Sequence, residues 1–191
     1  MPSKIFLLSP ASLNGIRAQQ LMSPKAGFDT ARMYRSPEGV PIALAFAFMS
    51  ALYFRGKITY ALHFTDIRNI FVITPGFGLV PPDWRITEER MNVMRRTDVD
   101  VRRRNYRLPL KRDAEALAAR LEPEAQVILL GSVATGKYVD ILWPIFGDRL
   151  RFPGIFAGLG DMSRGGLMLR AVRENRELEY TTLDAPRHKR P

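Results

Sequence analysis

Short apolar runs separated by longer mixed segments dominate the hydrophobic pattern of this chain. The runs are rich in isoleucine, leucine, valine and phenylalanine and end at proline or small residues, which is typical of buried β-strands. Continuous rather than alternating apolar runs favour strands that are covered on both faces. Four such strands are expected, at residues 5–8, 70–74, 127–130 and, as a shorter one, 150–156.

The segments between these runs predict helices. The longest apolar stretch runs from Val40 to Phe54, and Pro41 suits the first turn of a helix. We expect Gly56 to end this helix and a second helical piece to cover residues 57–69. The stretch is shorter than the ~20 residues that span a bilayer, which indicates a buried helix and no membrane anchor. Its large apolar side chains, expected to be nearly enclosed, are Phe46, Phe48, Leu52 and Phe54; further helices are expected at residues 111–121, up to residue 143, and at 162–178.

The alternation of strands and helices predicts the α/β class, with a mainly parallel sheet and helices on both of its faces. We expect a single domain over residues 1–184, with a basic insertion at about 84–112 and a flexible basic tail at 185–191. In such folds ligands bind beyond the carboxyl ends of the strands. Four small-residue loops are therefore expected to meet at one edge of the sheet; they contain Ser9-Pro10, Pro75-Gly76, Gly131-Ser132 and Gly158–Gly160.

This edge supplies the candidate catalytic residues. Serine hydroxyls are potential nucleophiles, and a carboxylate can stabilise a cationic sugar or activate water in a base-excising or base-modifying reaction. The candidates are Ser9, Ser12, Asp83, Ser132 and Asp161. The candidate ligand-loop residues are Pro10, Gly76, Phe77, Gly78, Gly131, Tyr138, Gly158 and Gly160.

The string GSVATGKY at residues 131–138 matches the phosphate-loop spacing. However, Tyr138 stands where a magnesium-binding Ser or Thr belongs, so magnesium-dependent ATP hydrolysis is not expected. Backbone amides at a helix start beside Lys137 would still favour an anion. The glycines at 158–166 have two readings, which are a ligand loop and a close contact between helix and sheet.

The charge balance indicates an anionic partner. The formal net charge is +10, and most of the basic residues are arginine, whose planar fork suits phosphate. Between Arg85 and Arg112 there are ten basic residues against four acidic ones. This basic segment can bind phosphate with stacking from Phe77, Trp84 and Tyr106, or it can be a solvated surface paired with acidic neighbours. The candidate anion-binding residues are Arg95, Arg96, Arg102, Arg103, Arg104, Arg107, Lys137 and Arg164.

Composition also excludes several kinds of chemistry. The chain contains no cysteine, which rules out disulfides, zinc–thiolate sites and a thiol nucleophile and fits a cytoplasmic location. With only two histidines no histidine metal site is expected, and neither a metal nor a cofactor is expected. The absence of a G-x-S-x-G string disfavours an ordinary serine hydrolase.

Several strings resemble the YaaA-like family, which comprises the peroxide-stress protein YaaA and its smaller relatives of unknown function. The run LLSPAS at residues 7–12 is similar to the family's opening strand and "ISPAK" loop, with Ser12 in place of the lysine. The run at 75–83 is similar to the "aRYGLLxP" loop. Further similar runs lie at residues 136–142, 152–153, 158–160, 163–168 and 174–176.

The resemblance implies an α/β fold, DNA binding and protection of DNA against oxidative stress; no catalytic mechanism transfers with it. The expected function is therefore a nucleic-acid-engaging domain that acts on or protects DNA bases, with DNA favoured over RNA as the partner. One alternative is an enzyme of N-glycosidase or transferase type acting on free nucleotides or another phosphorylated metabolite. Another is a non-catalytic module that docks an acidic protein. The sequence leaves the oligomeric state open.

Overall fold

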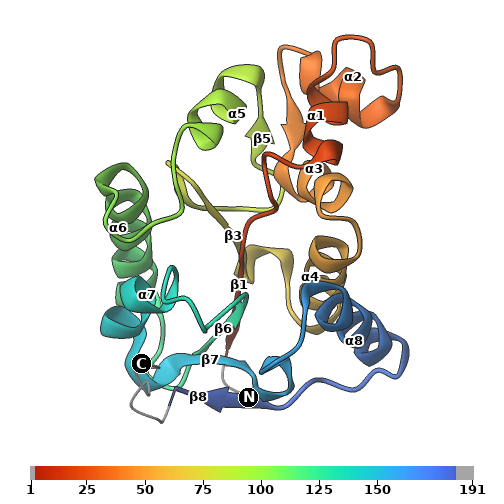
Figure 1. The fold of residues 1–191 in the computed structure, drawn as a ribbon. Coiled ribbons are helices and arrows are strands. Elements are labelled where there is room, and N and C mark those ends of the chain that lie inside the picture. The colour runs from red at the N-terminus through yellow and green to blue at the C-terminus, as the bar shows by residue number, and fades with distance from the viewer. Residues whose placement is uncertain (1–2, 184–191) are drawn as a thin grey trace.

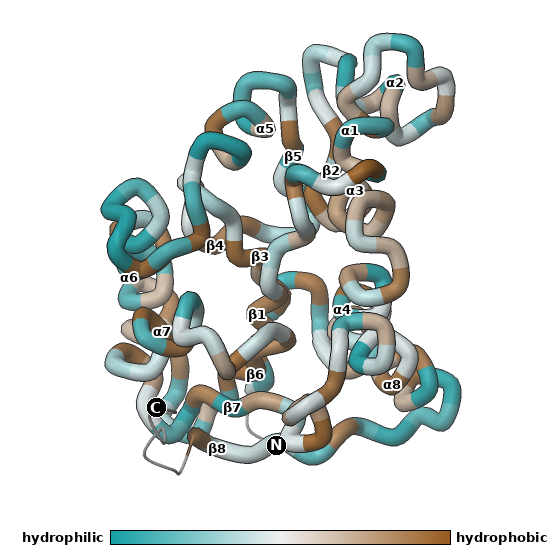
Figure 2. The backbone as a smooth tube through the Cα atoms, viewed as in Figure 1, coloured by the Kyte–Doolittle hydropathy of each residue, from teal (hydrophilic) through white to brown (hydrophobic). Residues whose placement is uncertain are grey.

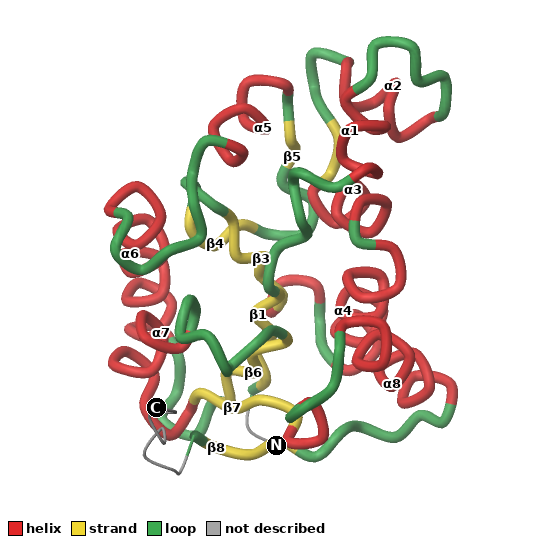
Figure 3. The backbone as a smooth tube through the Cα atoms, in the orientation of Figure 1, coloured by secondary structure: helices red, strands yellow, loops and turns green. Residues whose placement is uncertain are grey.

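The computed structural model describes residues 3–183, and its centre is a six-stranded sheet (Figures 1 and 3). The order of the strands is β4-β3-β1-β6-β7-β8, and β3, β1, β6 and β7 are parallel, with β4 and β8 antiparallel at the two edges. This confirms the predicted α/β class and the mainly parallel sheet. The strands are β1 (Lys4–Leu8), β3 (Ile70–Thr74), β4 (Gly78–Val80), β6 (Gln126–Leu130), β7 (Leu150–Pro153) and β8 (Tyr180–Thr182).

Alternate side chains of the central strand pack into two separate apolar cores, one on each face of the sheet. Phe6 and Leu8 belong to one core, and Ile5 and Leu7 to the other. All four are almost fully buried, which explains why β1 reads as a continuous apolar run rather than an alternating one. Figure 2 shows these strands as the hydrophobic centre of the molecule.

Helices cover both faces of the sheet, as expected. The first core is closed by α3 (Ile42–Met49), α4 (Ala51–Phe64) and α8 (Asp161–Arg173). The second is closed by α6 (Arg104–Arg120) and α7 (Val139–Phe146), on the opposite side of the sheet in Figure 1.

A further group of small elements lies above the carboxyl ends of the central strands in Figure 1, and the sequence pattern did not predict it. These elements have few residues, so they show no complete hydrophobic period. They are α1 (Ile16–Met22), α2 (Asp29–Arg35), α5 (Glu88–Arg95) and the two-stranded antiparallel sheet of β2 (Val40–Pro41) with β5 (Arg85–Ile86). Three short 3₁₀ helices cover Ile67–Asn69, Gly147–Arg149 and Gly154–Phe156.

The prediction that Gly56 ends the apolar helix is wrong. The break between α3 and α4 lies at Ser50 and Ala51, and Ala51 has a positive φ of 45°. Gly56 is instead buried inside α4, where a Cβ would lie 2.8 Å from the Gly165 carbonyl oxygen of α8. A Cβ on Gly165 would in turn lie 2.6 Å from the Leu52 carbonyl oxygen. These two glycines allow α4 and α8 to approach closely, so Gly165 serves a contact between two helices rather than the expected contact between helix and sheet.

The expected burial of the four large side chains is only half correct. Phe46 and Phe54 are fully buried, whereas Phe48 and Leu52 are partly exposed. Phe48 stacks on Phe28, with ring centroids 4.8 Å apart, at the outer side of α3. Because α3 ends at Met49, these residues do not lie on one helix face.

No helix among residues 3–183 is both long and apolar enough to cross a membrane. Other predicted boundaries shift: α6 begins at Arg104 rather than at Lys111, and α8 ends at Arg173 rather than at Leu178. The final predicted strand keeps only residues 150–153, because residues 154–156 form a 3₁₀ turn. The tail predicted at residues 185–191 lies outside the described residues.

Candidate functional site

A cleft of about 400 Å³ lies at the carboxyl ends of the central strands. We call it the strand-end cleft. One side is the loop that follows β1, and the opposite side is the end of α5 with the residues after it. Its lining residues are Pro10, Ala11, Ser12, Leu13, Asn14, Pro75, Met94, Arg95, Thr97, Asp98, Val99, Lys137, Tyr138 and Asp161. The predicted location of the site, beyond the strand ends, therefore holds a real concave surface.

Beside this cleft, a buried lysine meets the end of β1. Lys57 of α4 is fully buried, and its Nζ lies 2.8 Å from Ser9 Oγ and 2.7 Å from the Ser9 carbonyl oxygen. Ser9 is 4% exposed and directly precedes the cleft-lining residue Pro10. No carboxylate within residues 3–183 forms an ion pair with Lys57. An unpaired buried lysine is costly and uncommon outside functional sites.

Burial lowers the pKa of Lys57 from 10.5 to about 7. Desolvation of the ammonium is the main cause, and the positive charges of Lys137 and Arg164 act in the same direction. The Asp161 carboxylate partly opposes them. The aromatic faces of Tyr53 and Phe54 lie 4.1 and 5.1 Å from Nζ, so some stabilisation of the cation remains.

Two tyrosines complete the surroundings of this pair. Tyr53 is 7% exposed, and its buried hydroxyl has no hydrogen-bond partner in the described chain. Burial raises the pKa of Tyr53, with Arg164 and Ser9 close enough to oppose the rise. Burial also raises the pKa of Tyr138, whose environment includes Tyr53, Ser9 and Asp161. A buried hydroxyl without a partner is a group that a bound ligand or water can satisfy.

The fold brings this cluster together from α4 and the ends of β1 and β6. Lys57 follows Tyr53 by one helical turn of α4, so both face the end of β1. Ser9 is held by its backbone N–H, which donates to Leu130 at the end of β6. A Cβ on Gly131 would lie 2.9 Å from the Ser9 Cβ, so glycine leaves the room that Ser9 occupies.

The predicted catalytic residues separate in the structure. Ser9 forms the pair with Lys57, and Ser12 and Asp161 line the cleft. Ser132 is half-buried and does not belong to the lining, although Gly131 beside it contacts Ser9. Asp83 is exposed in the turn between β4 and β5 and is not part of the cleft.

The glycine loops have structural roles in this arrangement. In the string at 131–138, Tyr138 is buried against the pair. Gly76, Gly78 and Gly158 have positive φ angles of 88°, 75° and 75°, so each supplies a turn that other residues adopt with strain. Pro10 lines the cleft, Phe77 packs against Trp84 and Gly160 precedes the first turn of α8.

The basic candidates also divide into groups. Arg95 and Lys137 line the cleft, and Arg164 is largely buried beside Phe156. Exposed ion pairs join Arg102 to Asp100 and Arg103 to Asp98, as one of the two readings expected. Such pairs contribute little stability and leave the cations accessible. Arg96 and Arg104 are exposed and form no ion pair within the described residues, whereas Arg107 is half-buried and donates to the Val101 carbonyl oxygen.

Tyr106 cannot serve as a stacking surface. It is fully buried in the core between α6 and the sheet, and its hydroxyl donates to the Lys137 carbonyl oxygen. Trp84 is partly engaged, since Arg90 lies over its ring at 4.5 Å and Phe77 at 5.1 Å. The expected set of interleaved aromatic rings is therefore reduced to Phe77 and Trp84.

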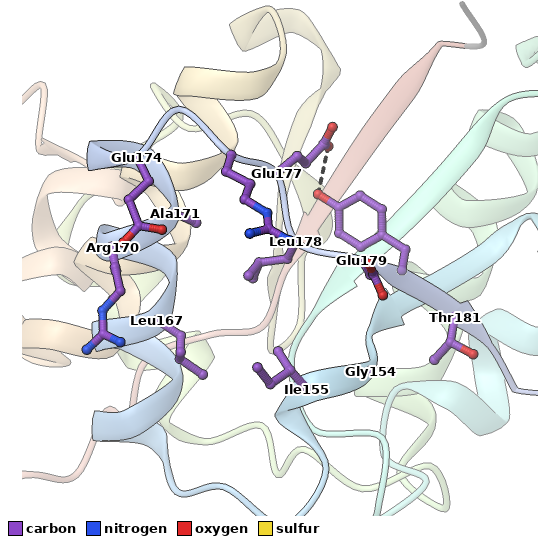
Figure 4. A pocket seen from close by; sticks show the side chains of 12 residues that line it. Gly154, Ile155, Leu167, Arg170, Ala171, Glu174, Glu177, Leu178, Glu179 and Thr181 are labelled. Atoms are coloured by element: carbon purple, nitrogen blue, oxygen red, sulfur yellow. Dashed lines mark hydrogen bonds between the residues drawn. The ribbon is translucent and has the colours of Figure 1, made fainter.

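A second cavity of about 520 Å³ lies between α8 and the return to β8 (Figure 4). Ile155, Leu167 and Leu178 supply its apolar wall, and charged side chains stand around it in Figure 4. Its one half-buried carboxylate is engaged, since Glu177 accepts from Tyr180 and pairs with Lys4, and its other charged side chains are exposed. It is larger than the strand-end cleft but lacks an unpaired buried ionisable group, so we place the candidate site in the cleft.

The sequence reading missed Lys57 and Tyr53, the two most informative residues of the site. The available signal was a lysine inside an otherwise apolar helical stretch. Because the apolar helix was predicted to end at Gly56, Lys57 was placed outside it and its burial was not expected. No cluster of three or more metal-binding side chains occurs within residues 3–183.

Comparisons with protein-family models, with curated proteins and with solved structures found no match to this chain. The resemblance to the YaaA-like family therefore stays a prediction, and a function has to be inferred from the site itself.

Proposed function

We propose that the protein binds nucleic acid, with a phosphate group in the strand-end cleft and the adjoining backbone along the basic segment at 85–112. One observation carries this proposal: the basic segment itself forms a wall of the cleft, through Arg95, Thr97, Asp98 and Val99. The cleft and the positive surface are thus parts of one site. Lys137 supplies a second cation on the other side.

This continuity favours a polymer over a free nucleotide. A single nucleotide would fill a cleft of about 400 Å³ and leave the cations outside it unused. Arg96 and Arg104 are exposed beyond the cleft and available for further phosphates. With Tyr106 buried, few aromatic rings are available for stacking, so phosphate contacts would supply most of the affinity. We take DNA as the first candidate because of the YaaA-like strings, and a cytoplasmic location because the chain lacks cysteine.

Neutralising three exposed arginines tests this proposal. In the variant Arg95→Gln/Arg96→Gln/Arg104→Gln, the slope of log K against log salt should fall by about 0.7–0.9 for each lost phosphate contact, and so by roughly 2–3 in all. Fluorescence anisotropy of labelled single-stranded and duplex oligonucleotides at several salt concentrations measures this slope.

The matched control is Arg55→Gln/Arg170→Gln/Arg173→Gln, which removes the same charge from exposed positions on α4 and α8 outside the cleft. Its slope should stay close to that of the parent. Equal slopes for all three proteins would mean that the basic segment does not contact phosphate. Strong competition by a nucleoside monophosphate would move the proposal to the free-nucleotide alternative.

A further inference from the structure

Binding of a phosphate chain makes no use of the most unusual feature of the site, the buried contact between Ser9 and Lys57. A lysine that only tied α4 to the end of β1 would need the carbonyl of Ser9 alone. Here the amine also lies 2.8 Å from the Ser9 hydroxyl. That is a hydrogen-bond distance, as the transfer of a proton from a nucleophile to its base requires.

The geometry suits a neutral amine. Such an amine has two N–H groups and one lone pair, so Lys57 can donate to the Ser9 carbonyl oxygen and accept the proton of the Ser9 hydroxyl. The carbonyl contact fixes the side chain in position. On α4 itself the ring of Tyr53 lies against the amine, and from other elements the charges of Asp161, Lys137 and Arg164 act on it.

We propose that Ser9 and Lys57 are a catalytic nucleophile and its general base, which attack the phosphorus of a phosphodiester bound in the strand-end cleft. This inference rests on the proposed function for its substrate class. Ser9 is next to the cleft-lining loop at residues 10–14, and Lys137 and Arg164 supply positive charge near the pair. The first turn of α8 begins at Asp161 without a side-chain cap and adds backbone amides that favour an anion.

The reaction balances with water as the only co-substrate. Ser9 Oγ forms a bond to phosphorus, the bond from phosphorus to one ester oxygen breaks, and the hydroxyl proton passes to Lys57 Nζ. The leaving oxygen then receives that proton from the ammonium. In the second half a water oxygen attacks phosphorus and gives a proton to Lys57, and Ser9 Oγ leaves and takes the proton back. The unpartnered Tyr53 hydroxyl can donate to a phosphoryl oxygen that carries developing charge.

Two probes test the pair on the full-length protein. Diisopropyl fluorophosphate is small and carries an electrophilic phosphorus; attack by Ser9 would release fluoride and leave one diisopropylphosphoryl group, located by peptide mass spectrometry. The labelling rate should rise with pH through about 7, as Lys57 loses its proton. Bis(4-nitrophenyl) phosphate, a phosphodiester, should release nitrophenolate with the same pH dependence.

Variants identify the residues. Ser9→Ala should abolish both signals, and Lys57→Met should slow both by about 100-fold or more. Ser3→Ala, at an exposed serine before β1 and outside the cleft lining, should match the parent. The pH profile of the unaltered protein needs no variant to fold. Absence of Ser9 labelling or of nitrophenolate release in the folded parent, or equal rates in folded Lys57→Met, overturns the inference.

Oligonucleotide binding separates this inference from the proposed function. Binding that persists in Ser9→Ala, together with loss of both chemical signals, supports the two proposals at once. If the parent binds oligonucleotide but Ser9 is not labelled, the catalytic inference is overturned and the proposed function stands. Labelling of Ser9 with no oligonucleotide bound at low salt would overturn the proposed function and, with it, the assignment of the substrate class.

Discussion

Lys57→Met is expected to remove about 4–5 kcal/mol of pH-dependent stability between pH 7 and pH 10.5. The reason is the difference between the pKa of about 7 in the folded protein and the ordinary value of 10.5 in the unfolded chain. Each pKa unit of difference corresponds to about 1.4 kcal/mol of free energy of unfolding.

The direction of the effect follows from counting protons. Below pH 7 the lysine is charged in both states and contributes the full cost of burying a cation. Between pH 7 and 10.5 the unfolded chain binds the extra proton, so the free energy of unfolding rises with pH. Above 10.5 the lysine is neutral in both states. In Lys57→Met this rise is missing.

Urea denaturation at several pH values between 6 and 9.5 measures the part of this rise that lies below pH 9.5, about 3 kcal/mol. This range stays below the ordinary tyrosine pKa of 10.0, above which the unfolded chain loses protons that the buried Tyr60 and Tyr53, with their raised pKa values, still hold. The control is Lys111→Met, at an exposed lysine of α6 that pairs with Glu115. Parallel curves for the parent and both variants would show that Lys57 keeps an ordinary pKa.

Phe46→Ala is expected to lower the free energy of unfolding by about 3–5 kcal/mol. Phe46 is fully buried in the core between α3, α4 and the sheet, and its ring meets Phe54 edge-on with centroids 5.3 Å apart. Removing the ring leaves a cavity that backbone elements on both sides cannot close. Chemical denaturation monitored by circular dichroism gives the value.

The partner variant is Phe48→Ala on the same helix. Phe48 is partly exposed and stacks on Phe28 under Arg17, so its loss should cost clearly less than the loss of Phe46. Equal losses of free energy of unfolding for the two variants would contradict the orientation of α3, in which Phe46 faces the core and Phe48 is partly exposed. A loss under about 1 kcal/mol for Phe46 would mean that this core is not packed as described.

The strands and layers could be predicted because burial on both faces leaves a local mark in the sequence. Each central strand is a continuous apolar run, and its ends are marked by Pro10, Pro75 and Gly131. The two antiparallel edge strands, β4 and β8, were not predicted because each is only three residues long. The break between α3 and α4 at Ser50 and Ala51 was not predicted either. Neither residue is a strong helix breaker, and the turn depends on the packing around it.

The candidate cleft lies where the sequence placed a candidate site, but the sequence did not indicate all of the residues around it. The rule for parallel sheets identified the edge and therefore Ser9, Ser12, Lys137 and Asp161. Lys57 was not predicted as a site residue, because it reaches the same edge of the sheet from the middle of a helix that is distant in sequence from the loops. Its meaning depends on burial, on the unpaired charge and on the approach of α8 through Gly165, none of which a local pattern encodes.

The arrangement also explains why the basic segment and the strand ends could not be connected from sequence. Residues 94–99 reach the cleft only because the fold places α5 beyond the carboxyl ends of the strands, next to β5 (Figure 1). The ion pairs of Arg102 and Arg103 with Asp100 and Asp98 agree with the reading of a paired surface for this part of the segment. The exposed arginines without an acidic partner are the ones that the binding proposal depends on.

The central claim is that Lys57 is a neutral amine in contact with Ser9 near pH 7, and NMR tests it most directly. In protein labelled with ¹³C and ¹⁵N at lysine, the Lys57 side-chain signal is identified by its absence from Lys57→Met. We predict that this signal titrates with a midpoint near pH 7, as a separate transition from the exposed lysines. A midpoint near the ordinary value of 10.5 would show that Lys57 is a charged structural residue, and would contradict its role as the base for Ser9.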